Sequence, residues 1–340
     1  MRHSHRFAAF ALGLGLATHL GLALAAPSGR IYTANERGAS LSQVQLDSGE
    51  VRSITLPIAP HNVQVSPDGS LLLAVGMPAH GAHHAGESAG GQLLVFATAA
   101  LEQPAFSLPA GEHPAHVVTD PAGRRAFVTD SAADRLRVFD LQQRAEIASV
   151  ATGRYPHGLR LSPDGRTLYV ANMRGDSVSV IDITTLKETA QIAVSGAPVQ
   201  VGFTPDGRQA FVSLSATNQL GIIDTASQRL VGRVGVGRTP IQVMASADGR
   251  QVYVANQGSS EKPDDRVSIV DLQTRQTIGN VTTGPGAHGV AISSDGAYVF
   301  VSNIEAGSVS VIDTASRTVV ATHRVGAGPN GISYAPAQAE

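Results

Sequence analysis

The sequence predicts an all-β chain that folds as a seven-bladed β-propeller, with four antiparallel strands in each blade. Two observations predict this fold: a short apolar strand that recurs along the chain, and a turn signal that recurs at regular spacing. A repeat of about 42 residues that holds four short strands is typical of a propeller blade. The seven copies of the strand are 31–35, 72–76, 126–130, 168–172, 210–214, 252–256 and 299–303.

The turn signal sets the register of the repeat. Where proline is present it presets φ, and the closing glycine tolerates a positive φ, so each copy predicts a tight hairpin. The closing glycines are 54, 42, 42, 42 and 47 residues apart, which indicates a long insertion in the second unit and a short one in the sixth. The six copies are 66–69, 120–123, 162–165, 204–207, 246–249 and 293–296.

One regular copy predicts the order of strands within a blade. The first strand is expected at 158–162 and the second at 167–172, with the turn between them. Residues 177–183 alternate small or polar with apolar side chains, which is the pattern of a half-buried third strand. A fourth strand is expected at 188–194.

The two ends of the repeat array predict how the ring closes. The array begins with a second strand at 31–35, and 329–336 matches a first strand that runs into a turn. Together these segments complete one blade, and such closure removes the free edge of the sheet. Six complete units and one shared unit therefore give seven blades.

The N-terminus resembles an export signal. Arg2 and Arg6 precede an apolar segment at 7–23, and the small residues at 23–25 form a cleavage site. We therefore expect a signal peptide at 1–25 and a single propeller domain at 26–340, exported to the periplasm. The alternative is an uncleaved membrane anchor. No later segment is apolar enough to span a bilayer, so no span is expected after cleavage.

The composition excludes several kinds of site. The chain has no cysteine, which excludes disulfides, thiolate metal sites and covalent C-x-x-C-H haem attachment. Charge is nearly balanced, with 25 Lys and Arg against 27 Asp and Glu, and aromatic residues make up 4% of the chain. Without a basic tract or many aromatic side chains, nothing indicates a nucleic-acid partner.

The repeat resembles a known family. The recurring strand that ends in Asn, the Ser-Pro-Asp-Gly turn and the Val-Ile-Asp-Thr segment at 311–314 are similar to the YVTN-type β-propeller repeat, over about residues 30–336. The resemblance implies an exported bacterial or archaeal surface protein. Similar propellers serve as binding scaffolds, as lactonases, as the haem domain of a nitrite reductase and as the copper-cluster domain of nitrous oxide reductase, so the fold does not settle the function.

Four histidines fall near the start of the first strands. His61, His157 and His288 stand eight residues before a turn glycine, and His116 stands at the next position of its own repeat. The first strand is innermost in a propeller, so these side chains are expected at one mouth of the central channel, where ligands of such folds bind. The remaining repeats carry Val199, Ile241 and Asn330 at the first of these positions.

The long insertion at 77–91 adds His80, His83 and His84, which the predicted topology places on the same face. Imidazole binds Zn, Cu, Ni and Fe, and a short histidine-rich tract indicates metal binding. The seven histidines are therefore a candidate site for a transition metal, copper or zinc. The alternatives are polar strand ends near solvent, structural hydrogen bonds between blades and a solvated loop.

Catalytic motifs are weak. The G-x-S-x-G match at 86–90 and the S-x-x-K match at 259–262 lie in inserted loops without the helix that such sites need. The acidic residues at 261–266 are expected to be solvated. The sequence therefore favours a monomeric, non-catalytic binding scaffold for a metal, a metal-containing cofactor, a small ligand or a periplasmic protein. The alternatives are a lactonase-like hydrolase and an envelope protein-interaction scaffold.

Overall fold

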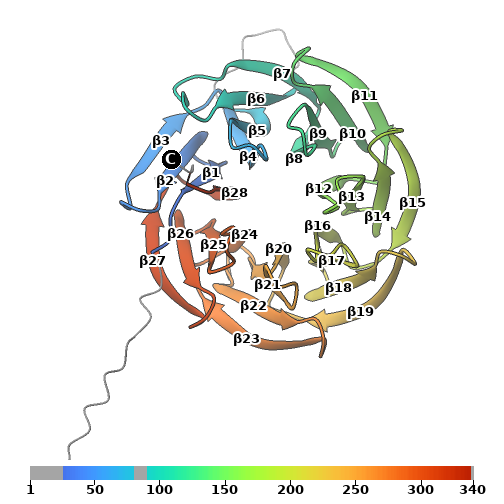
Figure 1. Cartoon of the computed structure of the whole chain (residues 1–340), viewed down its shortest axis with the longest axis vertical. Helices are drawn as coiled ribbons and strands as arrows, with labels where there is room; N and C mark the ends of the chain where they lie inside the picture. Colours follow the sequence, from blue (N-terminus) through green and yellow to red (C-terminus); the bar gives the residue numbers. More distant parts are fainter. Residues whose placement is uncertain (1–25, 80–89, 338–340) are drawn as a thin grey trace, which may run out of the picture.

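The computed structural model describes residues 26–79 and 90–337, and it confirms the seven-bladed propeller. Seven four-stranded antiparallel sheets follow one another around a central axis (Figure 1). The predicted signal peptide and the three insertion histidines, His80, His83 and His84, lie outside the described residues. In the described part, no helix is long and apolar enough to cross a membrane.

The two inner strands of each blade surround the axis. The innermost strands are β4 (Ile58–Val65), β8 (Pro114–Thr119), β12 (Pro156–Leu161), β16 (Pro198–Phe203), β20 (Pro240–Ala245), β24 (Ala287–Ile292) and β28 (Pro329–Ala335). The second strands are β1 (Arg30–Asn35), β5 (Leu71–Pro78), β9 (Arg125–Asp130), β13 (Thr167–Asn172), β17 (Gln209–Leu214), β21 (Gln251–Asn256) and β25 (Tyr298–Asn303).

The two outer strands complete each sheet. The third strands are β2 (Ser40–Gln45), β6 (Gly91–Ala97), β10 (Arg135–Asp140), β14 (Ser177–Asp182), β18 (Gln219–Asp224), β22 (Arg266–Asp271) and β26 (Ser308–Asp313). The outermost strands are β3 (Val51–Thr55), β7 (Phe106–Gly111), β11 (Ala145–Ala151), β15 (Lys187–Ala193), β19 (Arg229–Gly235), β23 (Gln276–Thr282) and β27 (Thr318–Arg324).

The ring closes as predicted. The last strand, β28, pairs antiparallel with the first, β1, from Arg30 opposite Ala335 to Ala34 opposite Gly331, and after a shift of one residue Asn35 lies opposite Pro329. Blade 1 therefore has the order β28-β1-β2-β3 and is built from both ends of the array, whereas blades 2 to 7 are each continuous in sequence. In Figure 1 the blue and red ends of the chain meet in this blade.

The core lies between blades rather than within them. Each of the seven apolar clusters combines side chains from two neighbouring sheets. For example, Phe300 and Val311 of blade 7 pack with Ile31 and Val44 of blade 1. Because the strands carry apolar side chains on both faces of each sheet, every sheet can bury both faces against the sheets of the neighbouring blades.

The Asp-Gly turns have the predicted geometry. Ser66 Oγ donates to Asp68 (2.6 Å) and accepts a hydrogen bond from the backbone N–H of Leu71 (2.9 Å). Gly69 closes the turn at φ 72°, a conformation that favours glycine. The hydrogen bonds to Asp68, the first from Ser66, lower its pKa below the ordinary value.

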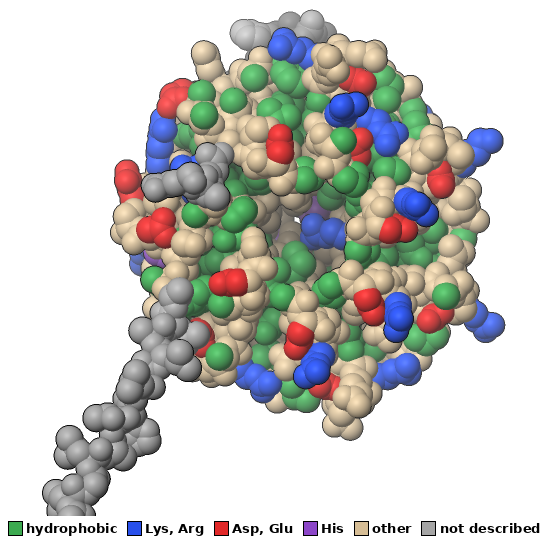
Figure 2. All heavy atoms as spheres, viewed as in Figure 1, with side chains coloured by type: hydrophobic (Ala, Val, Ile, Leu, Met, Phe, Trp, Pro, Cys, Tyr) green, Lys and Arg blue, Asp and Glu red, His purple; other side chains and the backbone are tan. Residues whose placement is uncertain are grey.

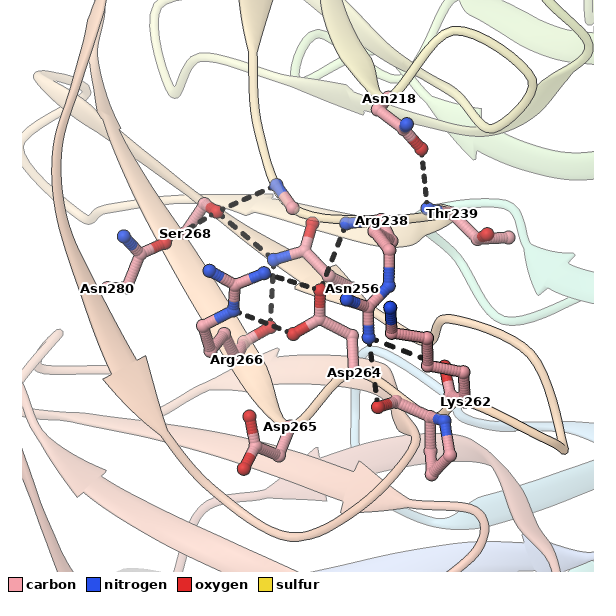
Figure 3. Close-up of polar contacts among 12 residues, drawn as sticks. Asn218, Arg238, Thr239, Asn256, Lys262, Asp264, Asp265, Arg266, Ser268 and Asn280 are labelled. Atoms are coloured by element: carbon pink, nitrogen blue, oxygen red, sulfur yellow. Dashed lines mark hydrogen bonds and ion pairs between the residues drawn. The ribbon is translucent and has the colours of Figure 1, made fainter.

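In the insertion of blade 6, Glu261 is exposed as expected, but Asp264 is not solvated. Asp264 is 2% exposed. Its carboxylate accepts hydrogen bonds from the guanidinium of Arg266 (2.8 Å to each oxygen) and from the backbone N–H of Arg238 (3.0 Å), as Figure 3 shows. We expected solvation because Asp264 is charged. In the structure, charge-assisted hydrogen bonds to neighbouring residues take the place of its contact with water.

Candidate functional site

A β-bulge in every innermost strand shapes the channel lining. In β12 the pairing with β13 is interrupted between Pro156 and Leu159, so that His157 and Gly158 stand outside the ladder. The pairing of β8 is interrupted between Pro114 and Val117, and that of β4 between Pro60 and Asn62. A bulge re-aims side chains, which explains how histidines at two successive repeat positions reach one place.

Hydroxyl groups of the second strands hold these bulges. Thr129 Oγ1 accepts a hydrogen bond from the backbone N–H of His116 (3.0 Å) and donates to the carbonyl of His157 in the next blade (2.7 Å). Ser213 makes the same pair of contacts with Gln200 (3.1 Å) and Ile241 (2.5 Å). The bulge of one blade is therefore fixed to the bulge of the next.

The structure brings three of the predicted histidines together. The ligand nitrogens of His61, His116 and His157 all lie within 4.8 Å of one another. The Nε2 atoms of His61 and His157 are 3.2 Å apart. The ring centroids are separated by 4.8 to 5.6 Å. We refer to these three residues as the histidine cluster.

Partners behind the rings orient two members of the cluster. His61 Nδ1 lies 3.3 Å from both oxygens of Glu36, which also accepts a hydrogen bond from Asn330 Nδ2 (2.6 Å). His157 Nδ1 lies 3.2 Å from the carbonyl oxygen of Val199. An acceptor at Nδ1 favours the tautomer that carries its proton there and leaves Nε2 free to bind a metal, as outer partners do in metal sites.

His116 lies deepest in the cluster. It is 2% exposed, and its Nδ1 lies 3.4 Å from the side-chain amide nitrogen of Gln200. Its Nε2 is buried and has no hydrogen-bond partner among the described residues. A buried polar atom left without a partner is costly, and a ligand in the cluster would remove that cost.

His288 stands apart from the other three. It is 5% exposed, and its Nδ1 lies 3.0 Å from the carbonyl oxygen of Asn330. It does not belong to the group whose ligand nitrogens converge. Its role in the described structure is a hydrogen bond between blades 7 and 1.

Burial favours the neutral form of His116, His157 and His288. It lowers the pKa of His157 to about 3 and that of His288 to about 4, and neighbouring histidines add to both effects. Burial also holds the pKa of His116 well below its usual range. Burial alone would raise the pKa of Glu36, but the hydrogen bonds from His61 and Asn330 and the electrostatic attraction of His61 and His288 together outweigh it and lower that pKa to about 2. The neutral imidazole is the form that binds a metal ion.

Sequence reasoning placed Gln200 at the channel mouth with the histidines but missed Glu36 as a partner of the cluster. Glu36 directly follows the recurring strand β1 and reaches His61 from the loop between the second and third strands. That contact agrees with the predicted topology, which places this loop and the start of the next blade on one face. The periodic pattern of the strands did not indicate the contact between Glu36 and His61, because the loops between strands have no regular pattern.

Two family models match parts of the chain. A model described as a YNCE-like β-propeller matches residues 105–249. A model described as the cytochrome D1 heme domain matches residues 214–328. Among proteins with curated descriptions, none matches the sequence significantly.

Solved structures share the fold at low identity. Hydrazine synthase from Kuenenia stuttgartiensis aligns with a TM-score of 0.69 and 20% identity, over 81% of this chain and 89% of that one. A candidate 6-phosphogluconolactonase from Bacteroides fragilis aligns with a TM-score of 0.72 and 15% identity, over 90% and 98%. The dihydro-heme d1 dehydrogenase NirN aligns with a TM-score of 0.65 and 16% identity, over 89% and 74%. These similarities extend to the fold alone.

Proposed function

This chain is a seven-bladed β-propeller, and from that premise we propose that it is a binding scaffold whose histidine cluster holds a transition metal ion, zinc or copper. One observation carries the proposal: three imidazole nitrogens from three blades lie within 4.8 Å of one another. Because proteins with this fold have many functions, the function has to be inferred from the histidine cluster.

The spacing in the cluster suits a small coordination sphere. With metal–nitrogen bonds of about 2.0–2.1 Å, two ligands of a tetrahedral site are about 3.3 Å apart. The Nε2 atoms of His61 and His157 are 3.2 Å apart, close to that value. His116 would supply the third nitrogen through a small shift of its ring, and a fourth position would remain for water or another ligand. Imidazole is a good ligand for both zinc and copper.

The first test is a calorimetric titration of metal-free protein with Zn²⁺ and, separately, with Cu²⁺. We expect one ion per chain, and loss of binding when His61, His116 and His157 are replaced together by Ala. The matched control is His323→Ala, because His323 lies on the outermost strand β27. Unchanged affinity in a folded triple variant would exclude the site.

The contact behind the ring gives a finer test. Glu36→Gln removes the charge that orients His61 but keeps a hydrogen-bonding side chain. Loss of such an outer partner weakens metal binding about 10-fold to 100-fold. An affinity equal to that of the unmodified protein would show that Glu36 does not support the site.

A metal-containing cofactor is the second candidate, favoured by the match of residues 214–328 to a heme-domain model. The cavity between His116 and Arg160 has a volume of about 10 Å³, so a macrocycle would have to bind at the mouth of the channel rather than in this part of its interior. Titration with haemin, followed by visible absorption, distinguishes the two. A spectral change that His61→Ala abolishes would favour the cofactor.

We further propose that the protein acts as an exported, periplasmic monomer without catalytic activity. The apolar N-terminal segment that ends in 23–25 supports export, and elemental analysis of protein purified from its own periplasm tests the metal at the same time. The alternatives are a lactonase-like hydrolase and an envelope interaction scaffold. Turnover of a lactone panel would favour the hydrolase, and a co-purified protein without metal would favour the scaffold.

A further inference from the structure

Arg160 is the one permanently charged side chain on the seven innermost strands. It lies on β12, three residues beyond His157 and therefore about 10 Å further along the channel. The residues at the corresponding positions of the other six innermost strands are Gln64, Val118, Gly202, Met244, Ala291 and Ser333, none of them charged. A single arginine in an otherwise uncharged lining needs a reason.

The guanidinium of Arg160 has no counter-charge in the described structure. Its Nε is buried without a hydrogen-bond partner. The ion pairs of the described residues engage other arginines, including Arg125, Arg137 and Arg266, but not this one. Burial lowers the pKa of Arg160, and no carboxylate offsets that effect. Arg160 as a whole is half-buried. A partly buried charge without a counter-charge is unfavourable, and a bound anion would compensate it.

A cavity opens beside this side chain on the face of the Asp-Gly turns. It has a volume of about 470 Å³ and is lined by Arg160, Arg30, Gln64, Asp68 and Tyr334, among others. Figure 2 shows Lys or Arg atoms at the central opening of one face, with histidine atoms deeper in it. The volume lies in the range of small-molecule sites.

The charge of the cavity is positive. Two guanidinium groups line it, whereas the carboxylate that lines it, that of Asp68, is already bonded by Ser66 (2.6 Å) and Ser70 (2.7 Å). Arg30 donates to Gln45 (3.1 Å) and retains its other N–H groups. The lining is therefore complementary to an anion rather than to a cation or a neutral molecule.

We propose that the channel binds a small organic oxyanion at Arg160, which enters from the face of the Asp-Gly turns. The planar guanidinium offers two parallel N–H groups, which match the two oxygens of a carboxylate or a phosphate. This site lies beyond the histidine cluster and does not depend on a metal.

The test measures thermal unfolding of the full chain after removal of metal with a chelator. Phosphate, glycerol phosphate and succinate are added at millimolar concentrations, with NaCl holding the ionic strength constant. A ligand that binds only the folded state raises Tm with its concentration. We expect a rise with the phosphate compounds or with succinate, and the compound that acts identifies the head group.

Variants at Arg160 separate binding from a general salt effect. Arg160→Met should unfold at a higher Tm in NaCl alone, because the uncompensated charge is gone, and should not respond to the oxyanions. Arg160→Lys should fold but bind at least about tenfold more weakly, because it lacks the planar fork. Arg208→Gln, at an exposed arginine of a turn, is the matched control and should respond as the unmodified chain does.

Two results would overturn the proposal. One is a Tm that neither class of oxyanion raises. The other is an equal rise in the unmodified chain and in Arg160→Met or Arg160→Lys, which would indicate a general effect of salts on the folded state. Neither result depends on whether the histidine cluster binds a metal.

Discussion

At the scale of single residues, the repeat register locates the histidines but does not choose among them. Counting back from the turn glycines gives His61, His157 and His288 as equivalent, yet the structure joins the first two with His116 instead. The bulge of each innermost strand explains this, because it turns two successive positions out of the ladder. A count of residues cannot reveal a bulge. His288 stays apart for a different reason: its strand β24 has the same bulge, but it belongs to blade 7, which blade 1 separates from the three neighbouring blades of the cluster.

The neutral channel histidines make stability depend on pH. In the unfolded chain a histidine has a pKa of about 6.5. In the fold, burial lowers the pKa of His157 to about 3 and that of His288 to about 4. Between these values the unfolded state binds more protons, so stability is complete above pH 6.5 and falls as the pH decreases.

We therefore expect the free energy of unfolding to decrease from pH 7.5 to pH 4.5 in urea titrations. At the lowest pH of this range, His288 alone would account for up to about 3 kcal/mol of the decrease in the free energy of unfolding, since one pKa unit corresponds to about 1.4 kcal/mol. His288→Gln should show a shallower decrease. A stability that does not change across this range would contradict the buried, neutral state.

At the scale of elements, the structure explains the residue that ends the recurring strand. Asn35, Asn172 and Asn303 are buried and donate to a third-strand serine seven residues further on, at 2.8 to 3.0 Å. The sequence showed that this asparagine recurs, but its partner on the next strand became evident only from the pairing. Blade 3 differs, because Asp130 and Arg137 occupy the two positions and form an ion pair of 2.9 Å.

This exchange predicts the outcome of a double substitution. Arg137→Ser leaves the fully buried carboxylate of Asp130 without its guanidinium, which should cost about 3 kcal/mol of unfolding free energy. Adding Asp130→Asn restores the pair found in blades 1, 4 and 7 and should recover most of that loss.

Chemical denaturation of the two single variants and of the double variant measures the coupling. Strictly additive losses would mean that the two residues act independently.

At the scale of the whole molecule, the number of blades and their closure followed from sequence because each blade has the same period and both ends of the array are incomplete. The interfaces between blades also follow from this regularity, since every sheet is apolar on both faces. What the repeat could not predict is the interior of the channel. Glu36 and Arg160 occur there only once each, and no periodic pattern indicates a residue that occurs once.

Closure by β28 should decide the stability of the ring. A chain that ends at residue 328 lacks this strand, leaves the edge of β1 unpaired and removes Ile332 from the cluster between blades 7 and 1. We expect a lower Tm and association through the open edge. The control is a chain that ends at residue 337, and thermal unfolding with size-exclusion chromatography compares the two.

Closure by β28 also determines the order in which the blades can form. Ser28 and Tyr334 are joined by a hydrogen bond although 306 positions separate them in the chain. Blades 2 to 7 can each form from one continuous segment, but blade 1 must wait until the last strand has been made. Contacts this distant in sequence slow folding. During synthesis, an incomplete ring therefore exists with β1 exposed at its edge, and that interval is when the chain most needs protection from other unfolded chains.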